Sequence, residues 1–296
     1  MTGRCNVCGA RGRFLRLERG REGTVCGNCG STSRNRAVAL TLGRVLGERL
    51  PVFAWRRRST VRVLESSPRG SLAMFFAEKF DYYATEYKPA AIAAGGHPRA
   101  FADFQKLHYE AGTFDLVIAS DVFEHIRHDA EAMRELHRVL RSGGELVLTV
   151  PYDHTRAQTI QRVDTTGPAD VHVLPPQYHG GGGHTLAYRE YGRDLVDLLA
   201  AAGFSVERVE LDDDALGITP QSVFVARKDA AVELAASGAI PRDRQTGPML
   251  WYRLFVAYKS RSLAPLFLAS GRVRGKYLFA GWTQLRRDFI HARQSR

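Results

Sequence analysis

The chain has 296 residues, of which 44% are hydrophobic and 25% charged, and it carries a net charge of +11. This composition is ordinary for a soluble globular protein, and the length suffices for one large domain or two unequal ones. No apolar run of about 18 residues predicts a membrane-spanning helix, and the N-terminus has no signal-peptide core. We therefore expect a cytoplasmic protein, with attachment to a membrane surface left open.

Positive charge is concentrated at the two ends of the chain. Residues 1–58 contain 13 Lys and Arg against 3 Asp and Glu, and residues 230–296 contain 12 against 3, whereas residues 59–229 contain 17 against 25. An acidic central region therefore lies between two basic ends. The ends would suit an anionic membrane surface or RNA, although solvated arginines that partly pair with the acidic region would give the same pattern.

The four cysteines form two matched pairs, Cys5-x2-Cys8 and Cys26-x2-Cys29, and each pair is followed by glycine. This spacing is typical of zinc knuckles, in which two tight turns supply four thiolates to a closed, structural, tetrahedral site. Two disulfides or four free thiols are the alternatives, and iron could replace zinc. We expect a zinc-ribbon-like module over residues 1–35, followed by a helical linker over residues 36–60.

A larger domain is predicted to begin at residue 61. Residues 61–65 have the pattern of a short strand, residues 66–70 (S-S-P-R-G) form a turn, and residues 71–80 place apolar side chains at helical spacing. Residues 82–85 are the second predicted strand, and residues 99–102 are the third.

The clearest pattern runs from Phe114 to Pro151. An apolar run at 114–119 predicts a strand buried on both faces, helical spacing up to Leu140 predicts a helix that Gly143 and Gly144 stop, and residues 146–150 predict a second strand. A strand, a crossover helix and a strand make a parallel βαβ unit. Ligands of such sheets bind at the carboxyl ends of the strands, where Ser120, Asp121, Glu124 and His125 lie.

The pattern FDLV…EH…RVL..GG.L….P in this region resembles the second half of class I S-adenosylmethionine (SAM)-dependent methyltransferases, and the resemblance covers roughly residues 61–228. It implies an α/β, Rossmann-like sheet of seven strands with SAM as cofactor. The first loop of such enzymes is usually rich in glycine. Here it is E-S-S-P-R-G, which together with T-E-Y at 85–87 resembles a particular subgroup of methyltransferase-like proteins.

The resemblance also implies which residues bind the cofactor. Glu86 ends the second strand, where a carboxylate suits the ribose hydroxyls; a surface glutamate beside Lys88 is the alternative. The adenine position falls on Asp103 and Phe104, although Asp103 could instead cap a helix. The remaining cofactor candidates are in the first loop or beside the strand ends, namely Glu65, Ser66, Gly70, Tyr87 and Asp121.

Residues 152–188 form a long connection after the fifth predicted strand, and in this fold such an insertion covers the acceptor pocket. Histidine suits a general base for methyl transfer to a hydroxyl group. The catalytic candidates are therefore His179, His184 and Tyr178 in the connection and His125 before it. A lid held by ordinary hydrogen bonds and, for His125, a structural role are the alternatives.

The last part of the predicted domain is a helix over residues 192–202 followed by a hairpin of residues 204–211 and 222–228. Beyond it, residues 229–296 mix aromatic and basic residues. Such a segment could pack on the domain as helices, contact a membrane surface or stack on nucleic acid.

We therefore expect a SAM-dependent methyltransferase that acts on an oxygen of a small molecule or glycan intermediate. An RNA methyltransferase and a non-catalytic binding protein with the same fold are the alternatives.

Overall fold

The computed structural model describes residues 1–17, 22–49, 51–179 and 185–229. The predicted extension therefore lies, apart from Asp229, outside the described residues, as does His184. The described residues all belong to one compact unit. Among the described residues, no helix is both long and apolar enough to cross a membrane.

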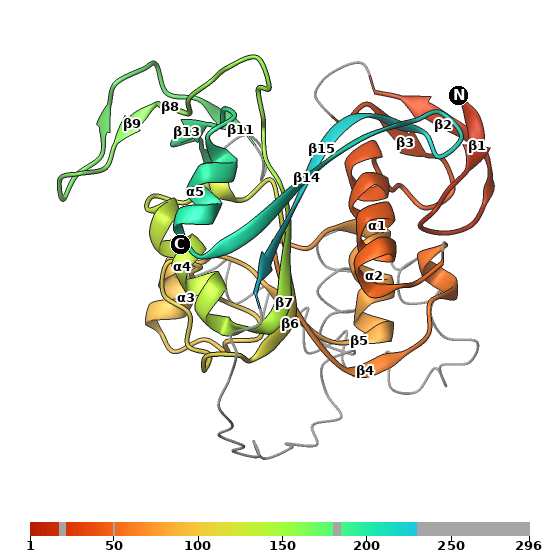
Figure 1. The fold of residues 1–296 in the computed structure, drawn as a ribbon, viewed down its shortest axis with the longest axis horizontal. Coiled ribbons are helices and arrows are strands. Elements are labelled where there is room, and N and C mark those ends of the chain that lie inside the picture. The colour runs from red at the N-terminus through yellow and green to blue at the C-terminus, as the bar shows by residue number, and fades with distance from the viewer. Residues whose placement is uncertain (18–21, 50, 180–184, 230–296) are drawn as a thin grey trace, which may run out of the picture. The chain divides into compact units, whose positions relative to one another are not determined.

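A six-stranded sheet in the order β14-β15-β7-β6-β4-β5 organises this unit (Figure 1). The strands β5, β4, β6 and β7 are mutually parallel, β15 runs antiparallel to β7, and β14 runs antiparallel to β15. The bounds are β4 Arg58–Ser66, β5 Phe80–Thr85, β6 Phe114–Ser120, β7 Leu140–Thr149, β14 Phe204–Asp213 and β15 Ile218–Lys228. This is the Rossmann-like α/β fold that the sequence predicts, including the terminal hairpin.

The predicted seventh strand is absent from the described part of the sheet. Phe101 makes a single parallel bridge to Glu86 instead of a strand. The amides of Ala100 and Phe101 both donate to the carbonyl of His97, at 2.9 and 3.1 Å, so a turn takes up the donors that a ladder would need. The prediction of seven strands was therefore wrong for this region, because turn bonds compete with strand pairing at residues 97–101.

Helices cover both faces of the sheet. Figure 1 shows α1 and α2 on one face and α4 and α5 on the other. The helices are α1 Ser33–Leu46, α2 Gly70–Lys79, α3 Pro89–Ala93, α4 Asp129–Val139 and α5 Leu195–Ala201, with short 3₁₀ turns η1 Val52–Ala54 and η2 Phe123–His125. Helix α4 ends before the Gly143-Gly144 pair, which instead lies within β7; Gly143 has a φ of 70° there.

In the described part of the connection after β7, all strands are two residues long. They are β8 Ile160–Gln161, β9 Val163–Asp164, β10 Val171–His172, β11 Tyr178–His179, β12 Thr185–Leu186 and β13 Arg189–Glu190. β11 pairs with β12, so that His179 lies opposite Thr185 and Tyr178 opposite Leu186.

The N-terminal residues form a three-stranded antiparallel sheet of β1 Thr2–Arg4, β2 Arg11–Arg16 and β3 Thr24–Cys26. This sheet contacts the turn between β14 and β15. The Arg4 amide donates to the Ala215 carbonyl at 2.9 Å, and the Thr24 hydroxyl donates to the Gly217 carbonyl at 2.6 Å. The cysteine-bearing segment is thus joined directly to the antiparallel edge of the central sheet.

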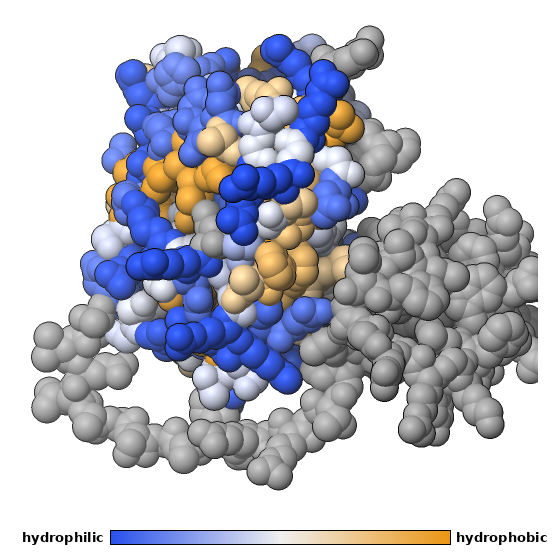
Figure 2. Space-filling view, turned by 90° about the vertical axis from the view of Figure 1, so that its right-hand side faces the viewer, coloured by the Kyte–Doolittle hydropathy of each residue, from blue (hydrophilic) through white to orange (hydrophobic). Residues whose placement is uncertain are grey.

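Some apolar side chains in the first 60 residues are exposed. Figure 2 shows hydrophobic residues in patches among hydrophilic ones on one face of the molecule. Among the described residues of this part of the chain, the exposed large hydrophobic residues are Met1, Leu15, Leu17 and Phe53.

Candidate functional site

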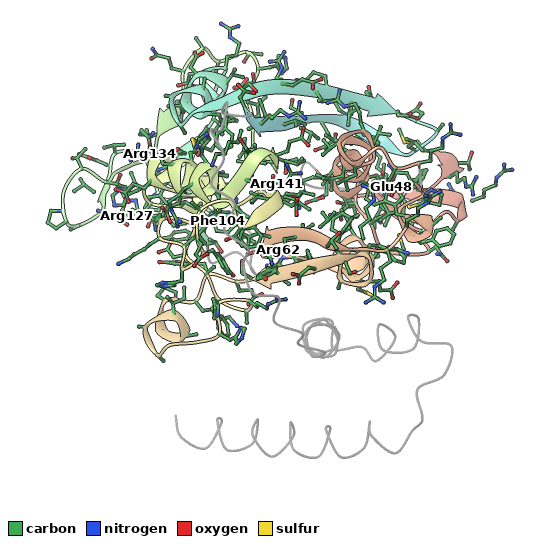
Figure 3. The ribbon with its side chains drawn as sticks, turned by 60° about the horizontal axis from the view of Figure 1, so that its bottom comes forward. Glu48, Arg62, Phe104, Arg127, Arg134 and Arg141 are labelled. Atoms are coloured by element: carbon green, nitrogen blue, oxygen red, sulfur yellow. The ribbon has the colours of Figure 1, made fainter. Side chains whose placement is uncertain are left out.

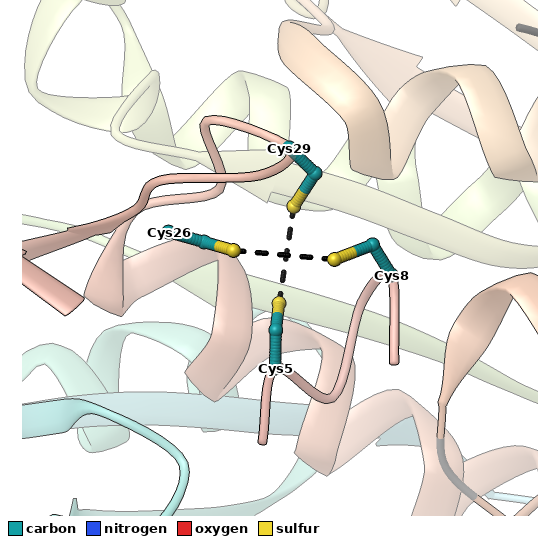
Figure 4. Close-up of side chains that lie close together, drawn as sticks. All are labelled: Cys5, Cys8, Cys26 and Cys29. Atoms are coloured by element: carbon teal, nitrogen blue, oxygen red, sulfur yellow. Dashed lines mark hydrogen bonds between the residues drawn. The ribbon is translucent and has the colours of Figure 1, made fainter. Parts of the chain in front are cut away.

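The four cysteine sulfurs converge on one point (Figure 4). The Sγ atoms of Cys5 and Cys29 are 3.8 Å apart, and those of Cys8 and Cys26 are 3.9 Å apart. Tetrahedral coordination with Zn–S bonds of about 2.3 Å would place sulfurs about 3.8 Å apart. The structure brings together the four cysteines that the sequence predicts as metal ligands, and their geometry fits a closed metal site.

Two equivalent turns hold the sulfurs in place. The Gly9 amide donates to the Cys5 carbonyl at 2.8 Å, and the Gly30 amide donates to the Cys26 carbonyl at 2.9 Å. Gly9 and Gly30 have φ values of 77° and 71°, a conformation that favours glycine. This explains why each CxxC pair is followed by glycine.

A buried arginine lies beside the cysteines. Arg36 of α1 is fully buried, and positive charge at that position interacts with all four thiols. A zinc ion with four thiolates carries a net charge of −2, so a buried cation beside it is favourable. The sulfurs also interact with one another: the hydrogen bond between Cys5 and Cys29 lowers the pKa of Cys29 and raises that of Cys5.

The cluster also borders the first loop of the central sheet. The buried hydroxyl of Ser71, in the first turn of α2, helps to lower the pKa of Cys29. Ser71 directly follows Gly70, which has a φ of 69°. Ser67 in the same loop has a φ of 53°, although it is not glycine. The cysteines are therefore close to the loop that the sequence identifies as the cofactor loop.

The first-loop candidates differ in accessibility. Glu65 is 7% exposed and accepts a hydrogen bond from the hydroxyl of Tyr82 in β5. Burial raises the pKa of Glu65 to about 7. Ser66 ends β4 and is also buried.

The cofactor candidates that follow β5 and those that follow the bridge at Phe101 differ in exposure and in their contacts. Glu86 is 8% exposed, and its carboxylate lies 3.1 Å from the ammonium group of Lys88. Tyr87 is exposed. The Asp103 carboxylate accepts from the Gln105 amide at 2.9 Å, and Phe104, labelled in Figure 3, is 4% exposed and belongs to the hydrophobic core. Little of the Phe104 ring is thus open to a ligand.

Asp121 follows β6 with a φ of 50° and is held from two sides. The Thr149 hydroxyl at the end of β7 donates to it at 2.9 Å, and the guanidinium of Arg34 in α1 lies 2.8 Å from its other oxygen. Arg34 also pairs with Glu22. Burial opposes the charge of Arg34, but Asp121 and Glu22 outweigh it and keep its pKa above the usual value.

Sequence reasoning did not identify Arg34, because nothing in the pattern of the first 35 residues indicates contact with β6. The structure nevertheless brings this residue of the cysteine-bearing region to the carboxyl edge of the sheet.

Three of the remaining side chains form a second cluster. The potential ligand atoms of Glu124, His125 and His179 lie within 4.8 Å of one another. The His125 and His179 ring centroids are 4.6 Å apart, and burial lowers the pKa of His125. Tyr178 is 53% exposed. The structure thus joins two of the predicted catalytic histidines and adds Glu124, which the sequence placed only at the functional edge.

The region from the first loop to β7 is similar to a known protein family. Residues 67–148 match the methyltransferase domain family. The match covers more than a quarter of the chain and spans α2, β5, β6, α4 and most of β7. Together with the order of the sheet, it supports the resemblance to class I SAM-dependent methyltransferases.

A curated relative matches a shorter segment. It is the sarcosine/dimethylglycine N-methyltransferase of Halorhodospira halochloris, 46% identical over 50 residues, which are 17% of this chain and 18% of that protein. The chain therefore covers less than a fifth of this relative.

Solved structures that align with part of this chain include a Burkholderia thailandensis 1,6-didemethyltoxoflavin N1-methyltransferase with bound S-adenosylhomocysteine. It has a TM-score of 0.39, 20% identity and coverage of 66% of this chain and 78% of that chain. A second is a putative methyltransferase from Bacillus halodurans, with a TM-score of 0.35, 14% identity and coverage of 64% and 99%.

Proposed function

We propose that this protein transfers a methyl group from SAM to a hydroxyl or carboxyl oxygen of a small molecule or glycan intermediate. The observation that carries the proposal is the match of residues 67–148 to the methyltransferase domain family, on a mixed sheet whose four parallel strands are followed by Glu86, Asp103 and Asp121 near their carboxyl ends. Ligands of open α/β sheets bind at this edge.

The residues at this edge fit the parts of SAM. SAM supplies an electrophilic methyl group on a sulfonium ion. Ser67 and Gly70 both have a positive φ in the loop after β4, and the backbone of this loop would contact the methionine part. The Glu86 carboxylate can accept two hydrogen bonds from the ribose diol, and Asp103 can accept from the adenine amino group.

The acceptor would bind beside Asp121, on the side where Glu124, His125 and His179 meet. Methyl transfer is an in-line displacement, so an acceptor atom must be held close to the methyl carbon and aligned with the C–S bond. His179, in the connection after β7, lies beside Glu124 and His125 although it is distant from them in the sequence. Side chains from two segments could thus form a pocket for a small acceptor.

We propose that the four cysteines hold a structural zinc ion. Three features support this role: the sulfur separations near 3.8 Å, the two glycine-ended turns and the buried Arg36. Four protein ligands leave no coordination position for substrate. The zinc ion would stabilise the region that supplies Arg34 to Asp121 and that borders the first loop.

Transfer of a labelled methyl group tests the proposed reaction. The purified, zinc-loaded protein would be incubated with methyl-labelled SAM and matched acceptors that offer a hydroxyl, a carboxyl or a secondary amine. The amine is included because the curated relative is an N-methyltransferase. Label in the oxygen acceptors is the expected result, whereas label in the amine alone would overturn the assignment of oxygen. Asp121→Asn should reduce turnover and serves as the site control.

A further inference from the structure

We propose that Glu124, His125 and His179 bind a divalent transition-metal ion of the zinc class, at a site separate from the four cysteines and open to oxygen atoms of a ligand. The cluster joins η2 to β11, two segments that are more than 50 residues apart in the sequence.

The distances suit a common metal ion. The Nε2 atom of His125 lies 3.7 Å from a carboxylate oxygen of Glu124, and one donor atom from each of the three residues lies within 4.8 Å of the others. Ligands bound tetrahedrally at about 2.0–2.2 Å lie roughly 3.3–3.6 Å apart. Small side-chain rotations would therefore bring all three donors to one ion.

The histidine next to Glu124 is already oriented as a ligand. Its Nδ1 atom lies 2.8 Å from the Leu186 carbonyl, which can only accept, so Nδ1 carries the proton. The lone pair is then on Nε2, the atom that faces Glu124. A hydrogen bond from the second ring nitrogen to a carbonyl is the usual support of a metal-bound histidine.

Buried contacts hold η2 in place. Arg189 is 2% exposed and donates to three carbonyls around η2, those of Phe123 at 3.1 Å, Ile126 at 2.6 Å and Arg127 at 2.8 Å. The Tyr188 amide donates to the Glu124 carbonyl at 2.8 Å. The backbone that carries Glu124 and His125 is therefore fixed before any ion binds, which lowers the entropic cost of binding.

The local charge favours a cation. The carboxylates of Glu22, Asp121 and Glu124 all interact with Arg34. Glu124 itself is 1% exposed. A divalent ion would be attracted to these carboxylates, in a region where water screens charge poorly.

The donor set indicates which ion and which ligand fit. Two imidazoles and one carboxylate favour zinc, cobalt or nickel over magnesium and calcium, which prefer oxygen donors alone. Three protein ligands leave at least one position free, unlike the four-cysteine site. If the proposed methyl transfer is correct, a hydroxyl or carboxylate oxygen of the acceptor would take that position, so this role of the metal rests on the proposed function, whereas the metal site does not.

Cobalt is the probe, because its visible spectrum distinguishes sulfur from nitrogen and oxygen ligands. Protein that already holds one equivalent of zinc at the cysteines would be titrated with Co²⁺. We expect one further equivalent to bind and to give weak visible bands without the near-ultraviolet charge-transfer bands of cobalt thiolates. His125→Ala and His179→Ala should each weaken this binding by more than about 100-fold, because loss of a direct ligand costs more than loss of an outer-shell partner.

His172→Ala is the matched control, because His172 is an exposed histidine in the same connection, and it should bind Co²⁺ like the unmodified protein. Circular dichroism would confirm that each variant is folded. Absence of a second equivalent, or second-equivalent binding unaffected by both histidine substitutions, would overturn the proposal. If the protein binds SAM but no second equivalent of Co²⁺, the metal site is refuted and the proposed function stands. If it binds the second equivalent of Co²⁺ but not SAM, only the proposed function is refuted.

Discussion

Replacing Arg36 with methionine tests whether the cysteine-bearing region and the central sheet stabilise each other. Arg36 is fully buried in α1, and its guanidinium donates to the carbonyls of Ser31, of Thr24 at 3.2 Å and of Gly217 at 2.7 Å. It also lies over the Phe14 ring, 4.5 Å from the centroid. One side chain thus joins β3, the segment before α1 and the turn between β14 and β15.

The expected loss of stability follows from these contacts. A hydrogen bond to a charged group contributes about 1.5–3 kcal/mol, and breaking a buried charge interaction costs about 3–5 kcal/mol in total. Two of the acceptors keep another donor, since Cys26 donates to Ser31 and the Thr24 hydroxyl donates to Gly217. We therefore expect the lower end, a decrease of about 3 kcal/mol in the free energy of unfolding.

Urea unfolding of the zinc-loaded protein, followed by circular dichroism, would measure this change. Arg44→Met is the matched control, because Arg44 lies in the same helix and pairs with Glu207 of β14, but both side chains are more than half exposed. It should cost less than about 1 kcal/mol. If Arg36→Met does not fold, Arg36→Lys should still give a measurable intermediate loss. Equal, small effects of Arg36→Met and Arg44→Met would refute the reasoning.

Three further predictions concern the cofactor site, the zinc site and pH. Glu86→Ala should weaken SAM binding by about 1–3 kcal/mol, because ribose hydroxyls would lose their acceptor, whereas calorimetry should show little change for Lys88→Ala; equal affinities for both variants would remove Glu86 from the site. Chelation of zinc should increase hydrogen exchange in β14 and β15 as well as in residues 1–30, since Ala215 and Gly217 are bonded to the N-terminal strands and α1; unchanged exchange in the hairpin would contradict this coupling. Burial raises the folded-state pKa of Glu65 from 4.5 to about 7, so its contribution to stability is fully present below about pH 4.5 and is lost as the pH rises to about 7, a difference of about 3 kcal/mol. Glu65→Gln should therefore flatten the decrease in stability across this range, and the same pH dependence in the variant and the unmodified protein would show that Glu65 is not its cause.

Much of the sheet could be predicted because its strands carry local signals. The apolar run of β6, the amphipathic face of α4 and the hairpin of β14 and β15 depend on residues that are neighbours in the sequence. The predicted strand near Phe101 had no such local signal. A segment this short can satisfy its backbone amides in a turn instead of in a strand. The end of α4 was misplaced because glycine is only one of several ways to end a helix.

The candidate site was predictable only where spacing determines proximity. The two cysteines of each CxxC pair are only three residues apart, so a single turn brings their sulfurs together, and the sequence predicted the cysteine cluster. Burial of Arg34 and Arg36 did not, because an arginine in a basic segment is normally solvated. The meeting of Glu124 and His125 with His179 depends on how the connection after β7 pairs with itself and with η2, and two-residue strands leave no periodic signal in the sequence.

Calorimetric titration of the purified, zinc-loaded protein with SAM and with S-adenosylhomocysteine tests the central claim most directly. The account predicts that both bind with micromolar affinity, despite the first loop with its single glycine at Gly70. If neither compound binds while the protein is folded and holds its zinc, the claim that this is a SAM-dependent methyltransferase is contradicted.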